Sequence, residues 1–481
     1  MELKKGQKTI TGWNQVLWES LIIAVIYLIG YLLSTTLTIL AALGLVASAI
    51  VLYFYYSFHG ERSFLKLKAV FSGVWLFTTG IAQFQFLSYQ EPWSSTTWLN
   101  MGLAHVTFVA GINLSATLFP SIENFLNGKV KSKAQRKFQI GSTDEKLFLV
   151  ATVSSIIGIL AFVANVMIKG YIPFFVINTN QNAYVDFYSR VHVFFVASLA
   201  SVGVSFYCLI NCTLAKWKKV TLAVYMFILV LVIPTLLVQR GAYIIASIVL
   251  TASIYAMSSK KFWVLIICGI FIVSGYLAGS SLRGYSDAQL AAFFPTKDAE
   301  PSPDDEEITA NPGINFQISP KLSFLYSYLT VSHDNFNSLV EQKTESTYGL
   351  YQIKPFNVVL RSSFIDEELE VQDEKLEDYR VLHHLTTFNL ISMAYMDFGT
   401  AGVFLFTLLW SFAFGLVETY YNRYKGPFSI AAYAVCLVPT ALSFFDPWMS
   451  NFVPWLLWGT VFLMFLGASL TRKRQPKLKN D

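Results

Sequence analysis

Apolar residues occur along the chain in long runs separated by short polar links. Most runs have about twenty residues, the length of helix that crosses roughly 30 Å of hydrocarbon. The pattern therefore predicts an all-α, polytopic membrane protein of about twelve transmembrane helices. The predicted helices cover 16–33, 37–57, 69–87, 99–119, 147–167, 191–213, 220–238, 241–257, 262–279, 393–417, 427–444 and 453–470.

Lys and Arg residues alternate between the links in the way that the positive-inside rule describes. With the N-terminus in the cytoplasm, the inner segments hold 24 of the 35 Lys and Arg residues. Three short outer links, around Thr35, Glu91 and Asp446, hold none. The rule predicts both termini inside. The basic start, followed by an apolar run without a small-residue cleavage site, predicts a first helix retained as a signal anchor.

One segment, 280–390, interrupts this pattern before the tenth helix. It holds 18 Asp and Glu residues against 8 Lys and Arg residues, and its length exempts it from the charge rule. We expect a large extracytoplasmic loop here, between membrane domains at 1–279 and 391–481. Within the loop, the apolar spacing over 318–340 predicts an amphipathic helix on the membrane surface, and the acidic runs predict solvated surface.

The composition excludes a soluble globular chain, since 54% of the residues are hydrophobic and only 14% are charged. The four cysteines all lie inside apolar runs, so we expect neither a disulfide framework nor a zinc site. The acidic run 304–307 has no histidine near it, and tight metal binding needs ligands held in place. We expect the bilayer as a partner, and no metal, cofactor or nucleic acid.

Two arginines lie at the outer ends of predicted helices. Arg240 sits at the tight turn before the helix 241–257, where a cation opposes the helix macrodipole. Such a cation is best tolerated where an anion also binds, because backbone N–H groups and a guanidinium then converge on one phosphate. Arg283 follows the next helix, 262–279, so the two guanidiniums can share a pyrophosphate if these helices pack together. For both, an arginine that snorkels to lipid headgroups is the alternative.

Lys169 and Arg190 flank another outer segment, Gly170–Val176, which is apolar and bent by proline. Two cations beside such a segment suit the phosphate headgroup of a lipid. Each is also an ordinary interfacial anchor, and the sequence leaves both interpretations open.

Three of the six histidines fall on the predicted outer side. His333 lies on the polar side of the predicted helix 318–340, and His383 and His384 precede the tenth helix. A histidine can act as a general base at neutral pH. His333 is therefore the first candidate for a base, and the pair is the second. A surface histidine without a chemical role is the alternative.

The most distinctive segment of the chain is Thr386–Gly402, which leads into the tenth predicted helix. It resembles the segment before a late helix in bacterial polysaccharide repeat-unit polymerases of the Wzy type. The matching residues are Thr387, Asn389, Tyr395, Asp397, Phe398, Gly399 and Gly402. The resemblance implies substrate-binding roles for Asn389, Tyr395 and Asp397. A helix start with a packing face for another helix explains the same residues without a chemical role.

Arg240 and Arg283, each followed by glycine, and the long late outer loop are also similar to those of this family. The resemblance implies an enzyme that transfers a growing glycan from undecaprenyl pyrophosphate to the non-reducing end of an incoming lipid-linked repeat unit. The reaction would take place on the outer face of the bacterial plasma membrane, and the need for a chain-length regulator stays open. Tyr348 and Tyr351 are candidates for stacking on the sugars.

Two other activities are compatible with the same features. An O-antigen ligase-like enzyme would share the lipid pyrophosphate donor and use a different acceptor. A transporter or flippase of lipid-linked oligosaccharide would need polar groups near the middle of the bilayer. The predicted spans hold few such groups, with Glu19 and Glu418 near inner helix ends, which favours an enzyme.

The predicted topology can be checked with a membrane-impermeant thiol reagent on single-cysteine variants. Ser302→Cys, in the predicted outer loop, should react in intact cells. Ser132→Cys, in a predicted inner link, should react only after the membrane is opened. The reverse pattern would overturn the orientation.

Overall fold

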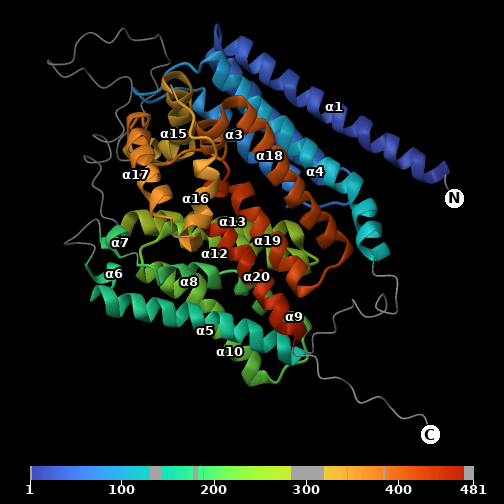
Figure 1. Ribbon diagram of the computed structural model, residues 1–481, viewed down its shortest axis with the longest axis vertical. Coiled ribbons are helices and arrows are strands. Elements are labelled where there is room, and N and C mark those ends of the chain that lie inside the picture. Colours follow the sequence, from blue (N-terminus) through green and yellow to red (C-terminus); the bar gives the residue numbers. More distant parts are fainter. Residues whose placement is uncertain are drawn as a thin grey trace. The chain divides into compact units, whose positions relative to one another are not determined.

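The computed structural model describes residues 3–129, 144–176, 183–187, 189–282, 319–343, 345–360, 362–382 and 385–470. Within these ranges the chain is helical and contains no strand (Figure 1). The twelve predicted apolar runs all fall on helices. Among the described residues, nine helices are long and apolar enough to cross a membrane, and three shorter apolar helices accompany them. The chain is a helical, multi-pass membrane protein.

Contacts divide the chain into two compact units, each built from segments that are far apart in the sequence. Unit 1 comprises 1–120, 285–419 and 439–452, and unit 2 comprises 121–284, 420–438 and 453–481. This division groups segments by contact, whereas the predicted boundaries separate the membrane helices from the outer loop.

Unit 1 combines the first membrane helices with helices of the predicted outer loop. Its described elements are α1 (Leu3–Ser34), α2 (Thr38–Phe58), α3 (Leu67–Ala82), most of α4 (Ser95–Lys129), α15 (Pro320–Gln342), α16 (Leu350–Leu360), α17 (Ser363–Asp378), most of α18 (Ser392–Arg423) and a 3₁₀ turn, η2 (Trp448–Ser450). Helix α2 packs along α3, α1 packs on α2, and α15 packs on α3.

Unit 2 contains the middle of the chain and its last helices. Its described elements are α5 (Asp144–Lys169), α6 (Pro173–Val176), α7 (Ala183–Asp186), α8 (His192–Ser198), α9 (Ser201–Asn211), α10 (Lys216–Phe227), η1 (Ile228–Val232), α11 (Ile233–Leu236), α12 (Arg240–Met257), α13 (Lys261–Leu282), α20 (Phe452–Leu470) and most of α19 (Pro427–Ala441). Helix α5 packs against α8 and α9, and α12 packs against α9 and α13.

Two predicted helices of unit 2 are interrupted. The run 191–213 forms α8 and α9, with a break at Leu199–Ala200. The run 220–238 forms α10 and α11, joined by the π-helical turn η1 just before Pro234. Proline lacks an amide hydrogen and its ring clashes with the preceding turn, which accounts for the second interruption.

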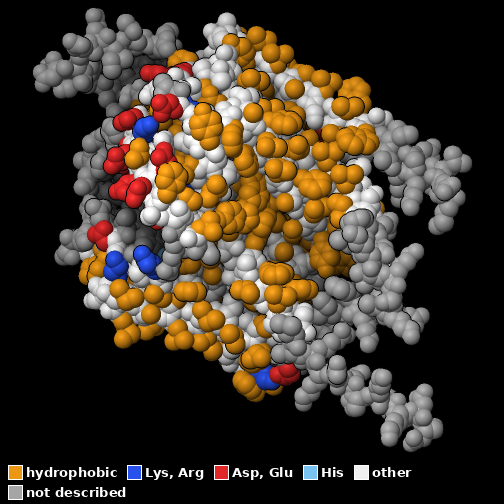
Figure 2. Space-filling model, in the orientation of Figure 1, with side chains coloured by type: hydrophobic (Ala, Val, Ile, Leu, Met, Phe, Trp, Pro, Cys, Tyr) orange, Lys and Arg blue, Asp and Glu red, His pale blue; other side chains and the backbone are white. Residues whose placement is uncertain are grey.

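Hydrophobic side chains cover much of the molecular surface (Figure 2). On α1, Trp18 and Leu28 are 65% and 57% exposed, and neighbouring apolar side chains are exposed with them. Such a surface would be unstable in water but suits lipid contact. The exposed acidic side chains are concentrated elsewhere, at the part of the view where α17 lies (Figure 2).

Helices α4 and α18 cross closely in unit 1 because small residues face each other. A Cβ atom on Gly111 would lie 2.0 Å from Oγ of Ser411, and one on Gly415 would lie 2.0 Å from Oγ of Ser115. The Ser411 hydroxyl donates a hydrogen bond to the carbonyl of Thr107, at 3.3 Å. Close approach through small residues is the usual way in which membrane helices pack tightly.

Helix α15 is present where the sequence predicts it, but its predicted position as a one-sided surface helix is wrong. Leu322 and Leu325 near its start are exposed, whereas most of the helix from Ser323 to Ser338 is buried by surrounding protein. Polar side chains on several sides of α15 find partners in other segments, which the amphipathic pattern did not reveal.

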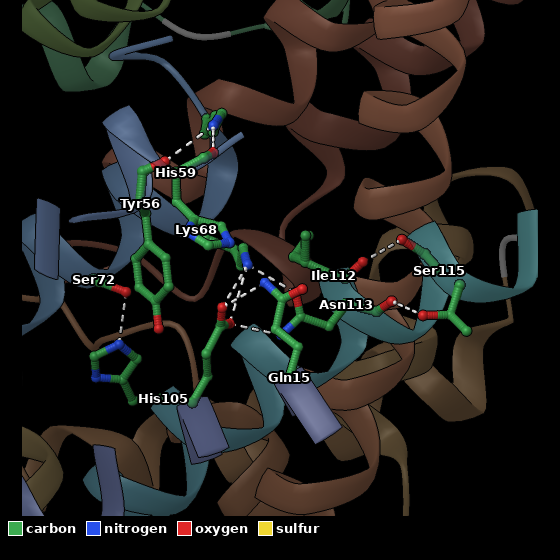
Figure 3. A network of polar contacts seen from close by, with 12 residues as sticks. Gln15, Tyr56, His59, Lys68, Ser72, His105, Ile112, Asn113 and Ser115 are labelled. Atoms are coloured by element: carbon green, nitrogen blue, oxygen red, sulfur yellow. Dashed lines mark hydrogen bonds and ion pairs between the residues drawn. The ribbon is translucent and has the colours of Figure 1, made fainter. Parts of the chain in front are cut away.

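A buried ion pair joins three helices of unit 1 (Figure 3). Glu19 of α1 is 3% exposed and lies 3.0 Å from the ammonium group of Lys68, near the start of α3. Asn113 of α4 donates to Glu19 at 2.7 Å and accepts from Lys68 at 2.7 Å. Gln15 donates to the same carboxylate at 2.7 Å, and Lys68 lies over the Tyr56 ring at 4.8 Å. The network satisfies both charges with neighbouring polar groups.

The ion pair should be needed for the stability of unit 1. Lys68→Met leaves Glu19 as a buried charge without its cation, and breaking a buried pair in this way costs about 3–5 kcal/mol. The double variant Glu19→Gln, Lys68→Met removes both charges and should recover most of that loss. Unfolding of the purified protein by SDS in mixed micelles measures the difference.

The exposed Lys260 provides a control for this measurement. Lys260→Met should leave the unfolding midpoint unchanged. If Lys68→Met unfolds at the same SDS fraction as the unaltered protein, the ion pair does not hold these helices together.

Candidate functional site

His333 is enclosed in the interior of unit 1. Its side chain is 0% exposed and meets the rings of Trp75 and Trp93 edge to face, with centroids 5.3 Å and 5.9 Å away. Its Nε2 atom lies 2.9 Å from Oγ1 of Thr78, and its Nδ1 atom lies 3.1 Å from Nδ2 of Asn389. The prediction that His333 lies on the polar, outward side of its helix is therefore wrong.

The hydrogen bonds define the state of this histidine. Asn389 accepts at its Oδ1 atom from the Ser392 hydroxyl, at 2.8 Å, so its amide nitrogen is the donor to His333. The Nε2 atom then carries the proton and donates to Thr78. Burial lowers the pKa of His333 to about 3. The imidazole is neutral, and both of its nitrogens are engaged, so this geometry gives His333 a packing role.

Asp334, the next residue of α15, is also buried, but its side chain points to a different side of the helix than that of His333. It is 4% exposed. Trp93 Nε1 donates to one carboxylate oxygen at 3.1 Å, and Gln90 Nε2 donates to the other at 3.0 Å. Gln90 is itself oriented by the hydroxyl of Tyr326, which donates to its Oε1 atom at 2.9 Å. The carboxylate is thus held in one orientation by neutral donors.

Asp334 lines a polar cavity of about 250 Å³. One wall is a face of α15, another is the link between α3 and α4, and a third is the end of α17 with the residues that follow it. The lining residues are Tyr89, Glu91, Asp334, Asn337, Ser338, Glu341, Gln342, Asp378, Arg380 and Val381. Positions 334, 337, 338, 341 and 342 follow helical spacing, so the sequence contains this stripe, although no single residue in it marks a site.

Two hydrogen-bond donors on the cavity wall are buried. The Tyr89 hydroxyl is hydrogen-bonded to the Thr330 side chain, whereas the Arg380 Nε atom has no acceptor among the described residues. Buried polar groups are normally hydrogen-bonded, so such a donor marks a place where a ligand or water supplies the partner. The carboxylates of the cavity are acceptors. The cavity therefore offers both kinds of hydrogen-bonding group to a polar ligand.

Glu341 is the carboxylate best suited to take up a proton here. Partial desolvation raises the pKa of Glu341, the nearby charge of Glu91 raises it further, and a hydrogen bond from Asn337 partly opposes both effects. A carboxylate with a raised pKa is a stronger base than an ordinary one. A reaction that needs ionised Glu341 would lose rate on acidification at a higher pH than is usual for glutamate.

The Asp397 carboxylate holds the start of another helix. Its Oδ1 atom accepts from the Thr347 hydroxyl at 2.5 Å and from the Tyr351 amide at 3.2 Å, and its Oδ2 atom accepts from the Gln352 amide at 3.1 Å. Tyr351 and Gln352 lie in the first turn of α16, so Asp397 caps that helix from a distance in sequence. Asp397 is 0% exposed.

The glycines of the same motif are explained by the backbone. Helix α18 breaks at Phe398 and Gly399, and Gly399 adopts φ +60° and ψ −146°, a conformation essentially restricted to glycine. A Cβ atom on Gly402 would lie 2.1 Å from the carbonyl oxygen of Ala394. The Tyr395 carbonyl accepts instead from the Lys343 ammonium group at 2.6 Å. The glycine spacing thus accounts for the kink in α18 and for the close contact that follows it.

The structure brings some predicted residues together. Asn389 contacts His333, and Tyr348 joins the break in α18 through its amide, which donates to the Asp397 carbonyl at 3.2 Å. The Tyr348 ring is 82% exposed, whereas Tyr351 is buried and its hydroxyl donates to Asp373 at 3.1 Å. Tyr348 is therefore the more accessible of the two candidates for sugar stacking.

Three of the cations predicted to bind lipid phosphate are described by the structure, and they lie in unit 2. Arg240 is the first residue of α12, as predicted, Lys169 is the last of α5, and Arg190 is exposed just before α8. The short helix α6, which follows Lys169, packs against α11, which precedes Arg240. Arg283, His383 and His384 lie outside the described residues, so the predicted pairing of Arg283 with Arg240 stays a prediction.

Within the described residues, no group of three or more His, Cys, Asp and Glu side chains is arranged to hold a metal ion. The four carboxylates around the cavity do not make such a group. Comparisons of the chain with protein families, curated proteins and solved structures found no match. The likeness to Wzy-type polymerases rests on the residues of the chain alone.

The motif residues should be important for stability. Asp397→Ala removes the acceptor for the start of α16, and losing a cap of this kind costs about 0.5–2 kcal/mol. Asp397→Asn keeps one carbonyl oxygen in place and should cost less. Gly399→Ala forces a side chain into a glycine-only conformation at about 1–3 kcal/mol. Thermal aggregation of the detergent-purified protein, followed by size exclusion, ranks the variants.

Gly44 is the matched control, since it is helical and a Cβ atom there would meet nothing within 4 Å. Gly44→Ala should aggregate no earlier than the unaltered protein. Equal stability of Gly44→Ala and Gly399→Ala would contradict the structural account of the motif.

Proposed function

We propose that the chain is a membrane-embedded glycosyltransferase that polymerises lipid-linked oligosaccharide repeat units, with the polar cavity of unit 1 as the site for the acceptor sugar. The growing glycan would be transferred from undecaprenyl pyrophosphate to the non-reducing end of an incoming lipid-linked unit. The proposal places the cavity on the outer face of the plasma membrane, as the predicted topology does for the link around Glu91.

The observation that carries the proposal is the chemistry of the cavity wall. Sugars present many hydroxyl groups that donate and accept hydrogen bonds at once. The cavity combines buried donors on Tyr89 and Arg380 with carboxylate and amide acceptors on α15. Pockets that bind polar ligands use a few such convergent groups in a concave site. A helical membrane domain with this cavity suits an acceptor on a lipid carrier.

The reaction needs a base for the acceptor hydroxyl and positive charge for the leaving group. The acceptor oxygen attacks the anomeric carbon, the bond from that carbon to the pyrophosphate breaks, and undecaprenyl pyrophosphate leaves with the electron pair. Asp334 or Glu341 would take the hydroxyl proton, replacing His333 in that role. Separately from the cavity, Arg240 and Arg283 are the candidates that the sequence offers to stabilise the charge on the diphosphate.

A transporter of lipid-linked sugar is the second candidate, and the buried pair of Glu19 and Lys68 is the observation in its favour. Charged groups inside membrane helices often mark transport pathways. An O-antigen ligase-like enzyme would use the same cavity with another acceptor.

The experiment is a gel assay with the purified protein and a synthetic pyrophosphate-linked repeat unit. The proposal predicts a ladder of products without nucleotide sugar. Asp334→Asn and Glu341→Gln remove the two candidate bases, and loss of the true base should slow the reaction about 100-fold or more. Arg240→Ala and Arg283→Ala should abolish the ladder, and Arg240→Lys should restore it only in part, because a lysine cannot form the bidentate contact.

Glu370→Gln on the exposed face of α17 is the control and should retain full activity. A ladder of normal rate in both cavity variants would refute the carboxylate base. If no ladder forms and the unit instead crosses the bilayer of sealed vesicles, the chain is a transporter.

A further inference from the structure

We infer that the acceptor sugar in this cavity is neutral or carries a free amino group, and that an acidic sugar is excluded. The inference rests on the proposed function, since it names the substrate class of the same site. It follows from the balance of charge on the cavity wall together with the distribution of that charge between the mouth and the buried end.

The cavity wall carries far more negative than positive charge. Glu91, Asp334, Glu341 and Asp378 line it, against one cation, Arg380. The Arg380 guanidinium also forms an ion pair with Glu377, whose carboxylate lies outside the cavity lining and 3.2 Å away. A carboxylate on the ligand would therefore meet several like charges and no free cation within the lining that the structure describes.

The charge is not uniform within the cavity. Asp334 is buried and fixed by Gln90 and Trp93, whereas Glu91 and Glu341 are exposed. Glu341 responds to the charge of Glu91, since its pKa is raised in part by that neighbour. A ligand ammonium group placed between these two carboxylates would relieve their mutual repulsion. The mouth of the cavity thus favours a cation, and its buried end favours a hydroxyl.

A buried donor on the cavity wall distinguishes the cavity from a purely acidic surface. The Arg380 Nε atom has no acceptor among the described residues, and a ring or hydroxyl oxygen of a sugar can supply one. A bare cation supplies none. An aminated or neutral sugar satisfies the donor and the carboxylates together, whereas a uronic acid satisfies the donor and adds repulsion.

The test compares three methyl glycosides: the glucoside as the neutral reference, the glucosaminide, in which an amine replaces its 2-hydroxyl, and the glucuronide, in which a carboxylate replaces its 6-hydroxymethyl group. Binding to the detergent-purified full chain is followed through tryptophan fluorescence, because Trp93 holds Asp334 at the cavity. At a pH where the amine is protonated and at low salt, the glucosaminide should bind at least as tightly as the neutral sugar. The glucuronide should bind at least about ten times more weakly than the neutral sugar, because its carboxylate is repelled by the like charges close to it.

Variants connect the preference to the cavity mouth. Glu91→Gln and Glu341→Gln should each reduce the advantage of the glucosaminide over the glucuronide several-fold, and added salt should do the same. Glu370→Gln should leave it unchanged. Equal or tighter binding of the glucuronide, a preference untouched by Glu341→Gln, or no binding of the glucosaminide each overturn the inference.

These outcomes are separable from those of the polymerase assay. A ladder from the repeat unit together with a preference for the glucuronide would leave the polymerase standing and refute only the charge selectivity. The expected binding pattern without any ladder would support the selectivity and refute the polymerase.

Discussion

Unit 1 depends on how the break in α18 is satisfied. A helix interrupted at Gly399 leaves carbonyl oxygens without their usual amide partners, and in apolar surroundings such groups must find other donors. The carbonyls of Tyr395, Met396 and Asp397 accept from the Lys343 ammonium group, the Thr347 amide and the Tyr348 amide. In return, the Asp397 carboxylate accepts hydrogen bonds from the amides of Tyr351 and Gln352 in the first turn of α16. Lys343 and residues 347–352 are thus fixed to α18 by donors and acceptors together.

The same docking sets the position of the cavity. Lys343 directly follows α15, so its contact with Tyr395 fixes the end of the helix that forms one cavity wall. Asn337 fixes the middle of α15 by accepting from Ser94 and Thr97 at the beginning of α4, at 2.9 Å and 2.7 Å. Asn335 ties its opposite side to the Thr387 carbonyl at 2.7 Å. A buried polar network that is satisfied at so many points specifies one arrangement of these segments.

The sequence predicts the helices well because their length and apolar character are local properties. It locates the break in α18 as a distinctive motif, but the partners of Asp397 lie at 347–352, and no local pattern connects them. The sequence predicts that His333 faces outward, because the polar side of an amphipathic helix usually meets water. In the structure those polar residues meet other protein segments, and Asp334, next in sequence, is the one that lines the cavity.

Two clusters of charged groups that the structure describes in unit 1 differ in what they leave for a ligand. In the first, Glu19 accepts from Lys68, Asn113 and Gln15, and Lys68 also lies over an aromatic ring. Each charge is met by its neighbours, which is the behaviour of a structural contact within membrane helices. In the second, around Asp334, the Arg380 Nε atom lacks an acceptor in the described part of the chain, and the charge of Glu91 raises the pKa of Glu341. A site that recognises a ligand keeps part of its hydrogen bonding and charge for that ligand, so the cavity is the better place to look for function.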